Sequence, residues 1–150
     1  MHGCVVITSI NPPTRAVQDW ARVSDLETIV VGDEKTPEDW ECADVTLLRV
    51  EDQLESGFRL SQSLPRSHYC RKNAGYLSAM TQSPAFIFDT DDDNAPIGWP
   101  DNLTPFVTGR VVEEPGWDNP YRHFSGGEEV WPRGLPLDQV SLCRNKAPAR

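Results

Sequence analysis

Short apolar runs rich in β-branched residues recur along the first two-thirds of the chain and alternate with segments of helical pattern. This alternation predicts an α/β fold with a mostly parallel sheet, right-handed crossovers and helices on the sheet faces. The expected strands are residues 4–10, 28–31, 45–48, 85–88 and 107–112. The expected helices are residues 15–22, a helix that starts at 36–39, residues 50–54 and residues 67–81. A chain of 150 residues is long enough for one domain with a real core.

Three of these helices carry specific local signals. Thr14 is a candidate cap for the first helix. In the second, Thr36 reads as a cap, and Pro37 suits the first helical turn. Residues 67–81 place Cys70, Ala74, Leu77 and Met80 at helical spacing, which predicts that these four residues face the core.

The pattern dissolves after residue 112, where proline and glycine recur every few residues and aromatic residues are interleaved. Pure linkers rarely carry so many aromatic residues. We therefore expect an α/β core over residues 1–112 and a loop-rich lid or acceptor-side segment of the same domain over residues 113–150.

Charge and cysteine spacing exclude several classes of protein. The net charge of −9 disfavours a nucleic-acid partner, because phosphate backbones are bound by clustered Lys and Arg. The four cysteines form no C-x-x-C pair, which argues against a zinc ribbon. We also expect no signal peptide and no membrane span in this chain, because no long apolar stretch is present.

An apolar run at residues 85–88 leads directly into four carboxylates, Asp89, Asp91, Asp92 and Asp93. Clustered acids repel one another, and hard divalent cations such as Mg²⁺ or Mn²⁺ prefer oxygen ligands of this kind. Ligands of open α/β sheets bind outside the carboxyl ends of the strands. The first two strands end near Asn11 and Asp33, so all three strand ends would lie along one edge. This convergence predicts a metal site that holds a phosphate-bearing substrate.

Other motifs fit the same letters less well. An EF-hand loop that starts at Asp89 would need Gly at its sixth position and Glu at its twelfth, where Asn94 and Pro100 stand. A phosphatase of the haloacid dehalogenase type also places D-x-D after a strand, but Gly and then Thr or Val usually follow. That phosphatase stays open as an alternative. No G-x-S-x-G elbow and no glycine-rich phosphate loop are present.

Residues 71–79, followed by residues 86–92, resemble the nucleotide-sugar core of GT-A glycosyltransferases, in which a helix with R-N-x-G leads to a strand that ends in D-x-D. Here one residue, Lys72, is inserted between the Arg and the Asn. The chain is more closely similar to STELLO-type glycosyltransferases. That similarity covers residues 6–14, 30–37, 69–77 and the aspartates, with looser matches at 119–122 and 131–137.

The resemblance implies a Rossmann-like GT-A nucleotide-diphospho-sugar transferase fold and a role for individual residues. Asp89 and Asp91 correspond to the D-x-D pair. The implied donor-binding residues are Thr8, Ser9, Asn11, Asp33, Arg71, Asn73 and Asp89. The implied ligands of an Mn²⁺ or Mg²⁺ ion are Asp91, Asp92 and Asp93. Arg71 would face the diphosphate or brace the acid cluster.

The implied activity is transfer from a nucleotide-sugar donor to an unknown acceptor, with metal assistance to the leaving diphosphate. GT-A domains are usually longer than this chain, and their later part supplies the acceptor pocket. We therefore expect a partial domain, completed by a further C-terminal half or by a partner. The alternative is a non-catalytic nucleotide-binding or scaffold module with a degenerate or truncated GT-A fold. The family resemblance suggests a Golgi or membrane-associated location.

Overall fold

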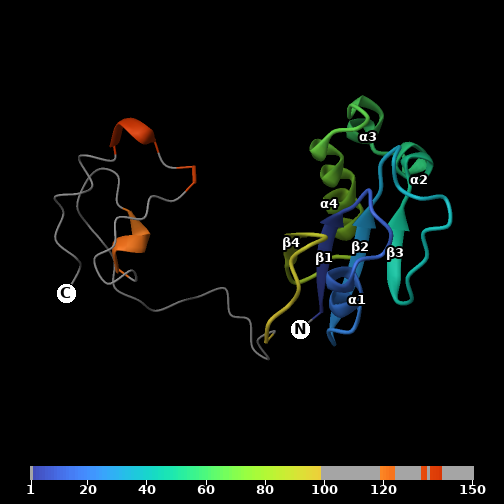
Figure 1. Ribbon diagram of the computed structural model, residues 1–150. Helices are drawn as coiled ribbons and strands as arrows, with labels where there is room; N and C mark the ends of the chain where they lie inside the picture. The colour runs from blue at the N-terminus through green and yellow to red at the C-terminus, as the bar shows by residue number, and fades with distance from the viewer. Residues whose placement is uncertain (1, 99–118, 124–132, 135, 140–150) are drawn as a thin grey trace. The chain divides into compact units, whose positions relative to one another are not determined.

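The computed structural model describes residues 2–98, 119–123, 133–134 and 136–139. The chain divides into two compact units, residues 1–103 and 104–150. The first unit carries the sheet and its helices (Figure 1). In the second, the described residues include two short 3₁₀ turns, η2 (Pro120–His123) and η3 (Leu137–Gln139). The strand expected at 107–112 and most of the segment 113–150 lie outside the described residues.

The first unit is built on a four-stranded sheet in the order β3-β2-β1-β4, in which every pair is parallel. Its strands are β1 (Gly3–Thr8), β2 (Leu26–Val31), β3 (Val45–Leu48) and β4 (Ile87–Asp91). The predicted α/β class with a parallel sheet is confirmed. The chain moves outward from β1 to β3 and then returns to the other side of β1. The strand order therefore reverses between β1 and β4, which is where open α/β sheets bind ligands.

Helices cover both faces of the sheet (Figure 1). They are α1 (Arg15–Ala21), α2 (Val50–Glu55), α3 (Arg59–Ser63), η1 (Tyr69–Arg71) and α4 (Lys72–Thr81). One core cluster joins Val5 and Val30 of the sheet to Trp20 of α1. The other joins Val6 and Val31 to Ala79 of α4. The two central strands are buried on both faces, which explains why they read as continuous apolar runs.

The prediction of a helix that starts at residues 36–39 is wrong. These residues form a turn instead, in which the Thr36 amide donates to the Asp33 carbonyl at 2.9 Å. The Thr36 hydroxyl accepts a hydrogen bond from the Asp33 amide and donates one to the Ser9 carbonyl. A threonine that bonds locally to backbone favours a turn over a helix. By contrast, Thr14 caps α1 as expected, since its side chain accepts from the Val17 amide.

The prediction of which residues in 67–81 face the core is also wrong in part. The α-helix starts only at Lys72, after the η1 turn, and its buried residues are Lys72, Ala74, Gly75 and Ala79. Met80, expected in the core, is 60% exposed. The reason is close packing at Gly75, which lets α4 approach β1 and β2 directly over the side chains of Val6 and Val31.

β4 begins two residues later than expected and ends three residues later. Its register pairs Cys4 with Ile87 and Thr8 with Asp91. Asp89 and Asp91 therefore lie within the strand rather than beyond its tip. In the part of the chain that the structure describes, no helix combines the length and apolarity needed to cross a bilayer.

Gly75→Ala tests the close packing of α4. Alanine normally stabilises a helix interior relative to glycine by about 0.5–1 kcal/mol. Here the new Cβ would lie 2.5 Å from Val31 Cγ2 and 2.6 Å from Val6 Cγ1, so we expect a loss of about 1–3 kcal/mol in the free energy of unfolding. Denaturant titration measures this value.

The matched control is Ser78→Ala on the same helix, for which we expect a change within about 0.5 kcal/mol. A stabilised Gly75→Ala protein would show that α4 does not pack on the two valines as described.

Candidate functional site

A pocket of about 290 Å³ lies at the carboxyl ends of β1 and β2. The side chains predicted to bind a ligand and found in its lining are those of Thr8, Ser9, Asn11, Asp33, Arg71 and Asp92. Asn73, Asp89, Asp91 and Asp93 lie outside the described lining. The pocket also includes Lys35, His68 and Tyr69, which are not among the residues predicted from the sequence to bind a ligand.

Hydrogen bonds between side chains join the ends of β1 and β4 beside this pocket. The Ser9 hydroxyl donates to Asp92 Oδ2 at 2.5 Å, and Asn11 Nδ2 donates to the same oxygen at 2.9 Å. The Thr14 hydroxyl donates to the Asp92 carbonyl. Asp92 therefore fixes the loop after β1, and the loop in turn fixes the orientation of Asp92.

Asp33, just past the end of β2, organises the opposite wall. Its carboxylate accepts hydrogen bonds from the backbone amides of Glu34 at 2.8 Å, and of Ser67 and His68 at 3.0 Å each. Partial burial alone would raise the pKa of Asp33, but these three amides and the charge of Arg71 lower it below its ordinary value. Asp33 is thus a charged anchor that holds the loop before η1 against β2.

Arg71 is 2% exposed and lines the pocket from the start of α4. Its Nε donates to Gln53 Oε1 at 2.8 Å, and its Nη1 donates to the Leu64 carbonyl at 3.1 Å. Gln53 is itself held by the carbonyls of Gly32 and Leu48, at 2.8 Å each. Arg71 Nη2 is buried without a hydrogen-bond partner among the described residues. A buried cation with an unused donor is suited to an anionic ligand.

The neighbouring Lys72 contacts the acid cluster instead of the pocket. Its side chain is 2% exposed, and its ammonium group forms ion pairs with Asp89 and, at 3.2 Å, with Asp91. It also donates to the Tyr69 hydroxyl and the Thr90 carbonyl at 2.7 Å each. Burial disfavours the charged amine, but the hydrogen bonds to Asp89, Tyr69 and Asp91 outweigh that effect and raise the pKa of Lys72. Asp89 and Asp91, two of the four clustered carboxylates, therefore share the single positive charge of Lys72.

In the sequence, Lys72 stands out only as an insertion in the R-N-x-G pattern. A lysine in the helix that precedes an acidic strand was the signal that could have identified its role. The expected bracing of the acid cluster by Arg71 is not seen, since the described partners of Arg71 are Gln53 and Leu64. Asn73 donates to the Cys70 carbonyl at 2.7 Å and so stabilises the η1 turn.

The aspartates do not fit one preformed metal site. Successive side chains of a strand point to opposite faces, so Asp89 and Asp91 face Lys72 of α4. Phe88 belongs to the alternate set, and its ring contacts Trp20 of α1 at a centroid distance of 5.1 Å. Asp92 lies in the turn after β4, where it accepts hydrogen bonds from Ser9 and Asn11. Within the described residues, no three of these carboxylates bring oxygen atoms within 4.8 Å of one another.

Asp33→Asn tests the anchor on the pocket wall. Because the amide loses the charge and one acceptor oxygen, we expect a loss of about 1–2 kcal/mol in the free energy of unfolding near neutral pH. Because the pKa of Asp33 is lowered in the folded protein, its ionised carboxylate stabilises the fold at pH values above the ordinary pKa of 3.8. This stabilisation is lost as the pH falls below 3.8. The difference between wild type and variant should therefore narrow below pH 3.8, as denaturant titrations at several pH values would show. Exposed Asp39→Asn is the control, and a constant difference across this range would contradict the anchor.

Lys72→Met tests the neutralisation of the acid cluster. The variant leaves Asp89 and Asp91 side by side without their shared cation, and we expect a loss of about 2–3 kcal/mol. Adding Asp89→Asn should recover part of this loss, because it removes the repulsion between the two carboxylates. Exposed Lys35→Met is the matched control. A Lys72→Met protein as stable as wild type would show that the ion pairs contribute nothing.

The comparisons with known proteins point to one kind of relative. No family model matches the chain. The chain is 30% identical, over 151 aligned positions that cover 91% of it, to "Probable glycosyltransferase STELLO1" of Arabidopsis thaliana. The identity and coverage are the same for "Probable glycosyltransferase STELLO2" of that plant. The chain spans 19% and 20% of the lengths of these two proteins. This similarity relates the chain to the STELLO-type probable glycosyltransferases over about a fifth of their length.

Proposed function

We propose that this chain is the donor-binding part of a glycosyltransferase and that its pocket receives the nucleotide of a nucleotide-sugar donor. The observation that carries the proposal is the buried Arg71, with one unused guanidinium nitrogen, in a pocket at the carboxyl ends of β1 and β2. This edge of the sheet, beside the point where the strand order reverses, is where open α/β folds bind nucleotides.

The pocket lining carries two cations, Arg71 and Lys35, and two carboxylates, Asp33 and Asp92. The carboxylates already accept hydrogen bonds from the protein, so the cations are the groups that would attract an anionic ligand. Arg71 is held by Gln53 through Nε and by the Leu64 carbonyl through Nη1, so Nη2 is the nitrogen left to donate a charge-assisted hydrogen bond to a phosphate oxygen. Lys35, on an exposed turn, would add a second positive charge at the rim. Together they would hold the diphosphate of the donor.

The neutral polar groups would orient the rest of the donor. Ser9 and Asn11 extend past the end of β1, and their contacts with Asp92 hold them in place. Asp33 already accepts three backbone hydrogen bonds, so its main role would be to fix the pocket wall. The acceptor and the sugar would be bound by parts of the protein outside these residues.

The Mn²⁺ or Mg²⁺ ion expected from the sequence stays a prediction. Asp91, Asp92 and Asp93 do not converge in the structure, and Lys72 engages Asp89 and Asp91. We therefore assign no step of the reaction to a metal ion. The same ion pairs favour the second candidate function, a nucleotide-binding module without catalysis, since Lys72 already pairs with both aspartates of the D-x-D pair.

Lys35→Ala tests whether the pocket binds an anionic ligand. Calorimetric titration of the wild type with UDP and GDP should show binding of one nucleotide per chain, and the variant should bind about tenfold more weakly, a difference of about 1.4 kcal/mol. Affinity for the uncharged nucleoside should not change. Arg15→Ala, an exposed cation on α1, is the control.

Each titration is repeated with Mn²⁺ and with a chelator, and donor hydrolysis is followed in parallel. Binding that needs Mn²⁺ would support the predicted ion, and binding without hydrolysis would favour the module. If neither nucleotide binds with or without Mn²⁺, the proposed donor pocket is wrong.

A further inference from the structure

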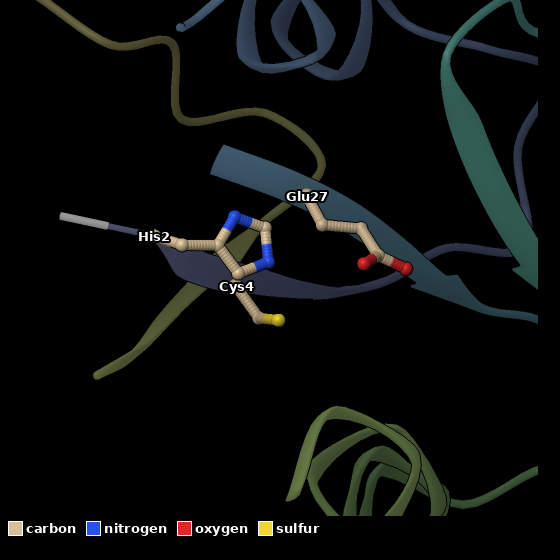
Figure 2. A group of neighbouring side chains, drawn as sticks. All are labelled: His2, Cys4 and Glu27. Atoms are coloured by element: carbon tan, nitrogen blue, oxygen red, sulfur yellow. The ribbon is translucent and has the colours of Figure 1, made fainter. Parts of the chain in front are cut away.

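A second cluster of chemically active side chains lies at the opposite edge of the sheet, at the amino ends of β1 and β2. It consists of His2, Cys4 and Glu27 (Figure 2). His2 and Cys4 are two residues apart along an extended segment, so their side chains share a face. Glu27 of β2 is the register partner of Cys4, which places its side chain beside the thiol on that face.

The three side chains are close enough to share one ion. One imidazole nitrogen, the Cys4 sulfur and one Glu27 carboxylate oxygen all lie within 4.8 Å of one another. Figure 2 shows the imidazole ring of His2, the sulfur and the carboxylate gathered on the two adjacent strands. A bound ion would need only small side-chain movements to draw these atoms to coordination distance.

The backbone and one further side chain fix the position of this cluster. The His2 carbonyl accepts a hydrogen bond from the Ala85 amide at 3.0 Å, so His2 is tied to the segment before β4. Gln82, which caps the end of α4, donates from Nε2 to Glu27 Oε1 at 2.7 Å. Its Oε1 lies 3.9 Å from the Cys4 sulfur. The cluster is therefore held from the strand side and from the helix side.

The donor atoms select a class of metal. A thiolate, an imidazole and a carboxylate together suit Zn²⁺ and similar borderline ions, whereas Mg²⁺ and Ca²⁺ prefer oxygen ligands alone. Three protein ligands leave the fourth tetrahedral position for water or for the Gln82 amide oxygen. The thiol loses its proton to solvent when the ion binds.

Without a cation the arrangement is unfavourable for a thiolate. Cys4 is fully buried, and burial together with the nearby charge of Glu27 raises the pKa of its thiol. A divalent cation would compensate the charges of both groups at once. Burial also raises the pKa of the Cys42 thiol, but Cys42 has no such ligand partners among the described residues and therefore offers a comparison.

We propose that His2, Cys4 and Glu27 form a binding site for Zn²⁺ that fastens the start of the central strand β1 to β2. The site lies at the amino ends of the strands, whereas the proposed donor pocket lies at their carboxyl ends. It is therefore independent of the proposed function, and its test uses neither nucleotide nor sugar.

The experiment uses the full chain and the metal alone. Co²⁺, a spectroscopic substitute for Zn²⁺, should bind one ion per chain and produce a near-ultraviolet charge-transfer band from thiolate to cobalt. Zn²⁺ should displace it. His2→Ala, a change at an exposed residue, should weaken Zn²⁺ affinity at least about 100-fold, since loss of even an outer-shell partner costs 10–100-fold.

Cys4→Ser should abolish the charge-transfer band, and Cys42→Ser should leave the band and the affinity unchanged. Because Cys4 is buried and its variant could fold poorly, Glu27→Gln and His2→Ala provide a second reading of the site. The proposal is overturned if wild type shows no cobalt–thiolate band. It is equally overturned if the band survives Cys4→Ser, or if His2→Ala binds Zn²⁺ as tightly as wild type.

Discussion

The central strand β1 pairs with a neighbour on each side, and the position of the proposed donor pocket depends on this double pairing. Its register sets Thr8 level with Val31 of β2 on one side and with Asp91 of β4 on the other. The next residues of the three strands then leave the sheet together. Ser9, Gly32 and Asp92 consequently meet at one edge, although they are far apart in the sequence.

Two buried cations lie at the junction of η1 and α4, and each contacts a different part of the first unit. Arg71 ends the η1 turn and Lys72 begins α4, and consecutive residues are rotated by about 100° in an α-helix and about 120° in a 3₁₀ turn. Arg71 consequently faces Gln53 and the pocket, while Lys72 faces Asp89 and Asp91. The same segment can offer a positive charge to a ligand and neutralise the carboxylates of the neighbouring strand.

The elements that could be predicted from sequence are those in which one strong signal acts alone. The apolar runs of β1, β2 and β3 predict a parallel sheet, and Thr14 predicts the start of α1. The convergence expected for the strand ends near Asn11, Asp33 and Asp89 followed from parallel topology, which fixes the edge at which such residues meet. Asn11 and Asp33 do line one pocket, but Asp92 rather than Asp89 joins them there. The roles of these residues in donor binding stay predictions.

Elements governed by contacts between distant residues could not be read in this way. Thr36 bonds to Ser9, 27 positions away, and so forms a turn where local signals favoured a helix. Lys72 is polar and was not counted toward the buried face of its helix, yet the ion pairs with β4 bury it. The His2, Cys4 and Glu27 cluster exists only because β1 and β2 are in register, and the spacing along the chain gives no sign of it.

The alternation of side chains along β4 bears directly on the D-x-D interpretation. Asp89 and Asp91 share the side of the strand that faces α4, whereas Asp92 lies in the turn after β4, so the described conformation does not gather the three carboxylates around one ion. Of the clustered aspartates, Asp92 is the one that lines the pocket, and Ser9 and Asn11 hold it there. Lys72, meanwhile, pairs with one oxygen of Asp89 and one oxygen of Asp91. A metal ion that entered this pocket with a donor would therefore meet Asp92 first among the clustered aspartates.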